Sequence, residues 1–190
     1  MDFRSPDFNL SNSDFDHASR LHGVMHTYRV MCHVLVLGKL EQLGRTAILS
    51  FCAAYIHDLS RRHDGICLKH GPRAASEKLP LYEEMFVRHG IRKEEIVGIA
   101  QAVAAHSQKN EVPADNVWYK ECILLKDADA LDRLRLGSYR LDPKYLRLQK
   151  SHTLLDFAQD LLDTTKEVKI LKFSEVLDIA EMKLGFSISQ

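Results

Sequence analysis

The chain has 190 residues, of which 26 are Lys or Arg and 26 are Asp or Glu, so its formal charge at neutral pH is zero. A balanced charge argues against a protein whose main partner is a nucleic-acid backbone, because such proteins are usually basic. The four cysteines form no CxxC pair, and the first residues contain no apolar signal segment. We therefore expect one domain with reduced thiols, no membrane span and a cytoplasmic location.

The first third of the chain predicts a polar segment followed by two helices. Residues 1–20 are rich in Asp, Asn and Ser and predict an N-terminal lead-in. Residues 22–43 carry a helical apolar stripe, and Gly44 is expected to cap this helix at its C-terminal end. Residues 46–58 are apolar almost all round, and a helix without a polar face belongs in the middle of a helical core.

This central helix ends in two side chains that can bind a metal, His57 and Asp58. A carboxylate at the edge of an apolar core is costly to bury unless it has a partner. The pair therefore indicates a metal ion, or at least another cation, at this place.

The rest of the chain predicts further helices and no strand. A basic loop follows over residues 59–69, and Pro80 is expected to interrupt or restart the next helix because it lacks an N–H. The helical patterns lie at 70–79, 81–89, 92–106, 117–136, 153–164 and 173–184. No run of alternating β-branched residues occurs, so we expect an all-α fold, a helical bundle around the central helix.

Several imidazoles and carboxylates lie at helix ends or on inward faces. They are His26, the pair His57-Asp58, His106 on the apolar face of its helix, and an aspartate within 127–132. This set of side chains suits a divalent ion such as zinc, manganese, iron or magnesium. The spacing alone leaves the existence of a metal site open, because the residues are far apart in the sequence.

The ordered series resembles a known superfamily. It comprises His22-Gly-x-x-His26-x-x-Arg29, His57-Asp58-Leu-Ser-Arg61, His70-Gly71, Ala105-His106-Ser107 and Lys126-Asp-Ala-Asp129-Ala-Leu-Asp132. In this order it is similar to the HD-domain metal-dependent phosphohydrolases, all-helical proteins with a His…His-Asp…Asp ligand set. The resemblance implies that His26, His57, Asp58 and Asp129 hold one metal. It also implies an HD-domain core over residues 21–150, with C-terminal helices in residues 151–190 packing on the same domain.

The last ligand and the number of metals are open at this stage. Asp127 and Asp129 are two residues apart and point in different directions on a helix. Asp129 follows Leu125 by one turn and fits the family pattern, so it is the expected ligand, with Asp127 as the alternative. His70 and His106 could hold a second metal bridged by Asp58. Alternatively, His70 caps its helix or binds a substrate phosphate.

The resemblance implies hydrolysis of a phosphomonoester or phosphodiester of a nucleotide-like or other small metabolite. Asp58 would orient a metal-activated water. Arg61 would act in catalysis and phosphate binding, with a solvated loop arginine as the alternative, and Arg133 would bind substrate. His22 is either a supporting group or a surface residue. The metal could be Mn, Fe, Zn, Co, Ni or Mg, and nothing indicates the substrate or the oligomeric state.

Two other classes of function fit the same residues. A di-iron oxygenase of the same superfamily would use all six ligands, including His70 and His106. A non-catalytic sensor would use the site to bind a nucleotide without turning it over.

Overall fold

The computed structural model describes residues 1–137, 141–167, 170 and 172–188, and within these ranges the regular structure is helical, with no strand. The α-helices are α1 (Val24–Leu40), α2 (Gly44–Ile56), α3 (His70–Arg73), α4 (Leu79–Arg88), α5 (Ile96–His106), α6 (Tyr119–Leu131), α7 (Leu155–Glu167) and α8 (Phe173–Leu184). The all-α prediction is confirmed.

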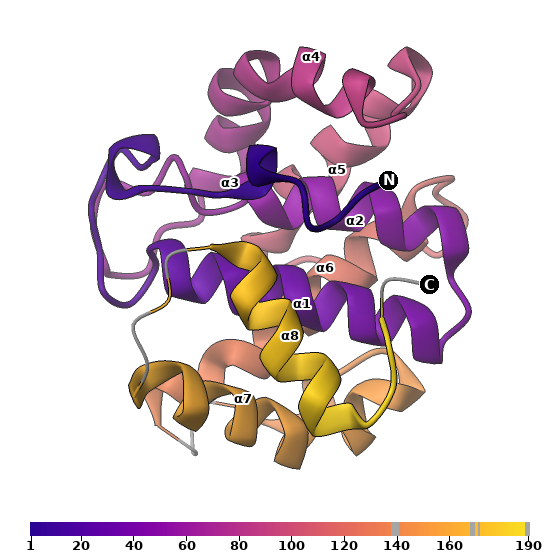
Figure 1. Ribbon diagram of the computed structural model, residues 1–190. Helices are drawn as coiled ribbons and strands as arrows, with labels where there is room; N and C mark the ends of the chain where they lie inside the picture. Colours follow the sequence, from indigo (N-terminus) through magenta and orange to yellow (C-terminus); the bar gives the residue numbers. More distant parts are fainter. Residues whose placement is uncertain (138–140, 168–169, 171, 189–190) are drawn as a thin grey trace.

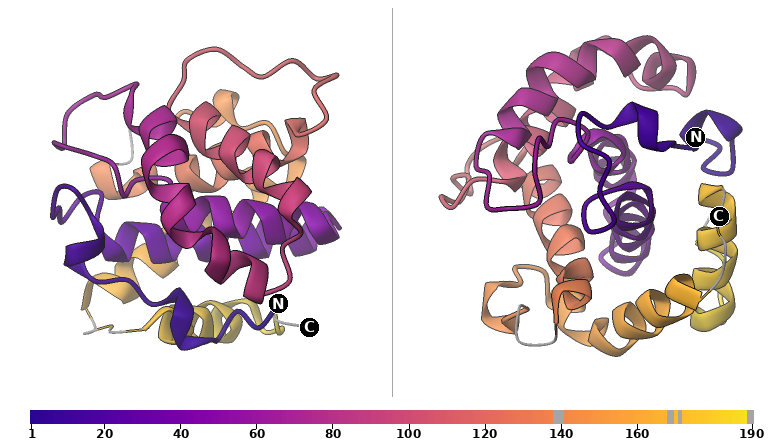
Figure 2. Two further views of the ribbon diagram at one scale, coloured as in Figure 1. Left: turned by 90° about the horizontal axis from the view of Figure 1, so that it is seen from above. Right: turned by 90° about the vertical axis from the view of Figure 1, so that its left-hand side faces the viewer.

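Helices α1 and α2 form the centre of the molecule (Figures 1 and 2). In the right-hand view of Figure 2 they are seen nearly end-on, with the later helices arranged around them. Almost every residue of α2 from Leu49 onwards is buried, as its apolar sequence predicts. Helix α1 is equally enclosed, with Tyr28 and Val30 fully buried. The sequence predicted one central helix, whereas two buried helices, α1 and α2, share the centre.

The connection from α1 to α2 corrects the predicted role of Gly44. Helix α1 ends at Leu40, and Gln42 adopts the left-handed conformation at φ 55°. The N–H groups of Gln42 and Leu43 donate to the carbonyls of Lys39 and Gly38, the pattern of a Schellman cap. Gly44, at φ 39°, opens α2 instead of closing α1.

Between α3 and α4 the chain remains helical across the proline. A π-helical segment, Ala74–Lys78, joins the two, and Pro80 lies in the first turn of α4. The missing N–H of a proline costs little in a first turn, so the helix restarts there as predicted. The wider hydrogen-bond spacing of the π segment connects α3 to α4 without a loop.

Both ends of the chain pack on the central pair. Phe8 in the N-terminal segment is fully buried, and the Leu10 N–H donates to the hydroxyl of Tyr28 at 2.7 Å. Helices α7 and α8 contact α1 and each other. The predicted lead-in thus contributes apolar side chains to the core. None of the described helices is long and apolar enough to cross a membrane.

Candidate metal centre

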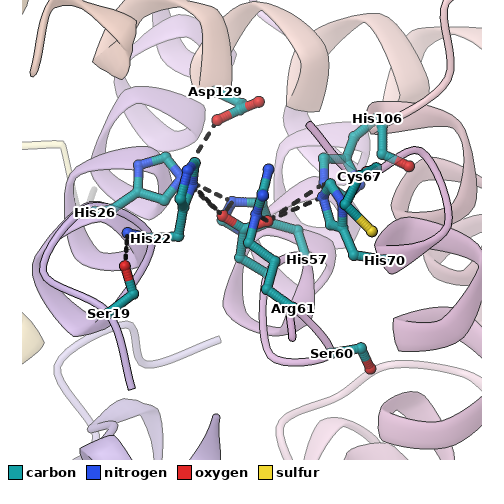
Figure 3. Close-up of polar contacts among 12 residues, drawn as sticks. Ser19, His22, His26, His57, Ser60, Arg61, Cys67, His70, His106 and Asp129 are labelled. Carbon is teal, nitrogen blue, oxygen red and sulfur yellow. Dashed lines mark hydrogen bonds and ion pairs between the residues drawn. The ribbon is translucent and has the colours of Figure 1, made fainter. Parts of the chain in front are cut away.

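The residues predicted as ligands lie at helix ends that meet beside the central pair. His26 is in the first turn of α1, and Asp129 is in the last turn of α6. The others are His57 directly after α2, Asp58 next to it, His70 at the start of α3 and His106 at the end of α5. Figure 3 shows His26 and Asp129 on one side, His70 and His106 on the other, and His57 between them.

A first group of atoms surrounds one carboxylate oxygen of Asp58. The Nε2 atom of His26 lies 3.3 Å from Asp58 Oδ2 and 3.3 Å from Asp129 Oδ1. The Nε2 atom of His57 lies 3.1 Å from that of His26 and 3.7 Å from Asp58 Oδ2. Two imidazoles and two carboxylates therefore converge within the reach of one small ion.

A second group faces the other oxygen of the same carboxylate. The Nε2 atoms of His70 and His106 lie 3.0 and 3.8 Å from Asp58 Oδ1, and 2.8 Å from each other. Asp58 thus lies between the two groups, with one oxygen directed to each. The His70 ring contacts the Cys67 carbonyl, His106 and Asp58, so it does not cap α3, whereas its binding of a substrate phosphate stays a prediction.

The outward nitrogen of each of these imidazoles is held by an acceptor. The Nδ1 atoms of His57, His70 and His106 contact the carbonyl oxygen three residues earlier, at 2.7, 2.5 and 2.6 Å respectively. For His57 and His106 these are carbonyls of the last helical turn, where helix carbonyls lack intrahelical partners. The Nδ1 atom of His26 contacts Asp132 Oδ2 at 2.7 Å.

These contacts determine which atoms face the centre. A neutral imidazole has one N–H and one lone pair, and the hydrogen-bond network places the N–H at Nδ1 in all four rings. Each Nε2 lone pair then points inward, next to other acceptors. Acceptors this close repel one another unless a cation lies among them. The buried His and Asp groups could therefore hold a metal ion.

The electrostatics of the centre also favour positive charge. Burial and Arg135 lower the pKa of His26, but Asp129, Asp132 and Asp58 outweigh them and raise it to about 9. Burial lowers the pKa of His57 to about 3. Burial alone would raise the pKa of Asp58, yet His57 and the other imidazoles hold it well below its usual range. The carboxylates around His26 therefore stabilise a cation in the middle of the centre, whether a proton or a metal ion.

The two candidate aspartates of α6 have different surroundings. Asp129 faces His26, as described above. Asp127 is fully buried elsewhere, where its Oδ2 atom accepts from the backbone N–H groups of Arg147 and Leu148 and from the hydroxyl of Ser151. Asp127 therefore anchors the segment before α7 and lies outside the centre.

The arginines predicted to bind phosphate or substrate, Arg61 and Arg133, line a cavity of about 670 Å³ next to the centre. The Nε atom of Arg61 donates to Asp58 Oδ1 at 2.8 Å, so this arginine neutralises the shared carboxylate directly. Arg133 lines the same cavity, together with Lys126 and Arg147.

His22 is buried beside the first group, which excludes the surface alternative. Its Nδ1 atom lies 3.1 Å from Asp58 Oδ2 and 3.0 Å from the Nη2 atom of Arg135. Sequence reasoning gave no role to Arg135, which also donates to the backbone carbonyl of Asp132. Its position after the end of α6, in the 3₁₀ segment Asp132–Leu136, carries no sequence signal that would have indicated this contact.

Comparison of the chain with protein-family models, with curated proteins and with solved structures gave no match. The helical fold and the His/Asp cluster are consistent with an HD-like site.

Proposed function

We propose that the protein is a metal-dependent phosphohydrolase with an HD-like centre. The observation that carries this proposal is the convergence of four Nε2 atoms on the two oxygens of Asp58, while the Nδ1 atom of each ring contacts an acceptor outside the centre. Such a donor set fits a divalent transition metal, because neutral imidazole and carboxylate are its usual protein ligands.

The proposed ligands form two sets that share Asp58. His26, His57 and Asp129 would complete the first set, and His70 and His106 would complete the second. When bound, divalent ions at such a site lower the pKa of a water molecule and polarise a phosphoryl oxygen. The two-metal version is supported by the orientation of Asp58, whose oxygens each face one pair of imidazoles.

The protein's own groups would hold and orient the reactants. Arg61 fixes Asp58 through its Nε atom, so it keeps both carboxylate oxygens directed at the two sets. Its side chain is 13% exposed and lines the cavity, where its guanidinium could also bind a phosphate oxygen. Arg133 and Lys126 would add positive charge further along the cavity wall.

The cavity supports a small-molecule substrate. A volume of about 670 Å³ lies within the usual range for sites that enclose small ligands. We therefore propose a phosphomonoester or phosphodiester of a nucleotide-like or other small metabolite.

One observation favours a second candidate function. The second imidazole pair completes a six-residue set that a di-iron oxygenase of this superfamily would also use. Iron content and the spectrum of a coupled di-iron pair in anaerobically purified protein would distinguish the two reactions. The arginines that line the cavity favour the phosphohydrolase, because they suit an anionic substrate.

The direct test is a hydrolysis assay on phosphomonoesters and phosphodiesters with Mn²⁺, Co²⁺, Ni²⁺ or Mg²⁺ added in turn. We expect turnover that a chelator abolishes and that is lost in His57→Ala. The matched control is His89→Ala, because His89 also follows the last residue of a helix but contacts Asp7 outside the centre, at 2.9 Å. Tight binding of a phosphorylated ligand without turnover under any metal would instead support the hypothesis of a non-catalytic, nucleotide-binding sensor.

A further inference from the structure

One carboxylate next to the centre is not among the proposed ligands. Asp132 is 1% exposed, and its Oδ2 atom lies 2.7 Å from the Nδ1 atom of His26. Arg29 holds the same carboxylate at both oxygens, with its Nε atom 2.5 Å from Oδ1 and its Nη2 atom 3.1 Å from Oδ2. The three residues form a buried chain that ends at the metal-facing ring.

A structural ion pair between Arg29 and Asp132 would not need His26. The guanidinium already contacts both carboxylate oxygens, so the charge of the buried aspartate is compensated without the imidazole. The contact with His26 is therefore an additional one, and in the described part of the chain Asp132 is the hydrogen-bond partner of the His26 Nδ1 atom.

The position of His26 explains why it needs an external acceptor. The other three rings donate to the carbonyl three residues earlier. For His26 that carbonyl belongs to Gly23, and it already accepts the N–H of Thr27 as the first bond of α1. The local carbonyl of His26 thus already has a backbone partner, and the acceptor for its Nδ1 atom comes from elsewhere. Asp132 supplies it from another element.

We propose that Asp132, held by Arg29, is a positioning residue that fixes the tautomer and orientation of His26 and so sets metal affinity at the first group. This inference rests on the proposed function, because it requires a metal ion at His26. Carboxylates that accept from the outer nitrogen of a metal-bound imidazole act in this way, and their loss typically weakens metal affinity about 10–100-fold.

The chain of contacts extends into the C-terminal part of the protein. The Nη1 atom of Arg29 lies 3.3 Å from the hydroxyl of Thr165, a buried residue of α7. The Thr165 hydroxyl itself donates to the carbonyl of Leu161 at 2.7 Å. Helix α7 therefore also holds the guanidinium of Arg29 through Thr165. Removal of this hydroxyl in Thr165→Val should weaken metal affinity less than removal of the Asp132 charge.

The test compares Asp132→Asn with Asp127→Asn in the full-length protein. Asp127 is an equally buried aspartate five residues earlier, with an arginine partner of its own, but it faces away from the centre. Co²⁺ is the probe, since its visible spectrum reports on the ligands. Titration of the metal-free proteins gives affinity, and thermal unfolding in a chelator gives stability.

We expect Asp132→Asn to bind Co²⁺ about 10–100-fold more weakly than the wild type and to shift its spectrum. Asp127→Asn should lose stability but keep the affinity and spectrum of the wild type. Wild-type affinity and spectrum in Asp132→Asn would overturn the positioning role while leaving the proposed function intact. Equal losses of affinity in both variants would assign the effect to the fold and overturn it as well. Absence of Co²⁺ binding by the wild type would refute both this inference and the proposed function.

Discussion

Substitution of Gly71 by alanine should increase the distance between the imidazoles of His70 and His106. Gly71 follows His70 in α3, where the helix lies against the end of α5. A Cβ atom at this position would lie 2.6 Å from the carbonyl oxygen of Val103 and 2.6 Å from the hydroxyl of Ser107. The Val103 oxygen belongs to the backbone and also accepts from His106, so it cannot turn away as a side chain would.

The size of the displacement follows from these distances. Ordinary contacts of a Cβ atom begin at 3.4 Å, so α3 must move from α5 by about 3.4 − 2.6 = 0.8 Å. Metal–ligand distances tolerate only about 0.2 Å, so His70 and His106 should no longer share an ion. Overpacking should also lower the free energy of unfolding by about 1–3 kcal/mol.

The assay is metal stoichiometry by elemental analysis, beside thermal unfolding in a chelator. We expect Gly71→Ala to hold one ion per chain fewer than the wild type and to keep the first. The control is Gly90→Ala in the loop after α4, where φ is +91° and no atom lies within 4 Å of the added Cβ. Backbone strain alone should lower the free energy of unfolding of Gly90→Ala by about 1–2 kcal/mol, and its metal content should stay that of the wild type. Equal stoichiometry in Gly71→Ala and the wild type would refute the reasoning.

Three further predictions concern single carboxylates and one buried imidazole. Asp129→Asn should abolish hydrolysis and weaken metal binding, whereas Asp127→Asn should retain hydrolysis; the reverse ranking in a kinetic comparison would contradict the geometry. Hydrogen bonds from Arg45, the largest cause, and from Arg92 hold the pKa of Glu95 well below its usual range. Its stabilising effect is thus present above about pH 4.5 and is lost as the pH falls. Urea unfolding should show Glu95→Gln less stable than the wild type by about 1–3 kcal/mol at pH 7, with the difference shrinking below pH 4; a constant difference would argue against the ion pair. Burial lowers the pKa of His33 to about 4, and neither ring nitrogen has a hydrogen-bond partner in the described part of the chain. The free energy of unfolding of the wild type should therefore fall as the pH decreases from about 6.5 towards 4. At pH 5 the free energy of unfolding of His33→Leu should exceed that of the wild type by about 1–2 kcal/mol. Equal values would indicate that the His33 ring has a hydrogen-bond partner.

The fold was predictable where one apolar pattern decided the structure. The all-round apolar character of residues 46–58 could only suit a buried helix, and α2 is buried. The position of His106 three residues after Val103 placed it on the apolar face, and its side chain is 2% exposed. These predictions depend on local periodicity, which the sequence contains.

Contacts between distant segments were not predictable in the same way. Asp127 and Asp132 are both buried, but one is satisfied by residues 147–151 and the other by Arg29 of α1. Helical periodicity gives the face on which each lies, and it does not give the segment that meets that face. The left-handed cap at Gln42 was missed for another reason, because glycine is the usual residue in that conformation and Gly44 stood nearby.

The structure explains why a glycine follows His70. The sequence presents Gly71 as part of a pattern, without a reason for the small residue. The structure supplies the reason, since α3 and α5 approach so closely that a methyl group would meet a backbone carbonyl. The glycine lets the two helices bring their histidines within 2.8 Å of each other.

The metal content of the purified protein tests the central proposal most directly. Elemental analysis of the wild type, His57→Ala and Asp58→Ala, each after incubation with divalent metals and removal of the excess, measures it per chain. We expect about one to two transition-metal ions in the wild type and loss of most of them in both variants. A wild type without bound metal, or variants that keep the wild-type content, would contradict the metal centre.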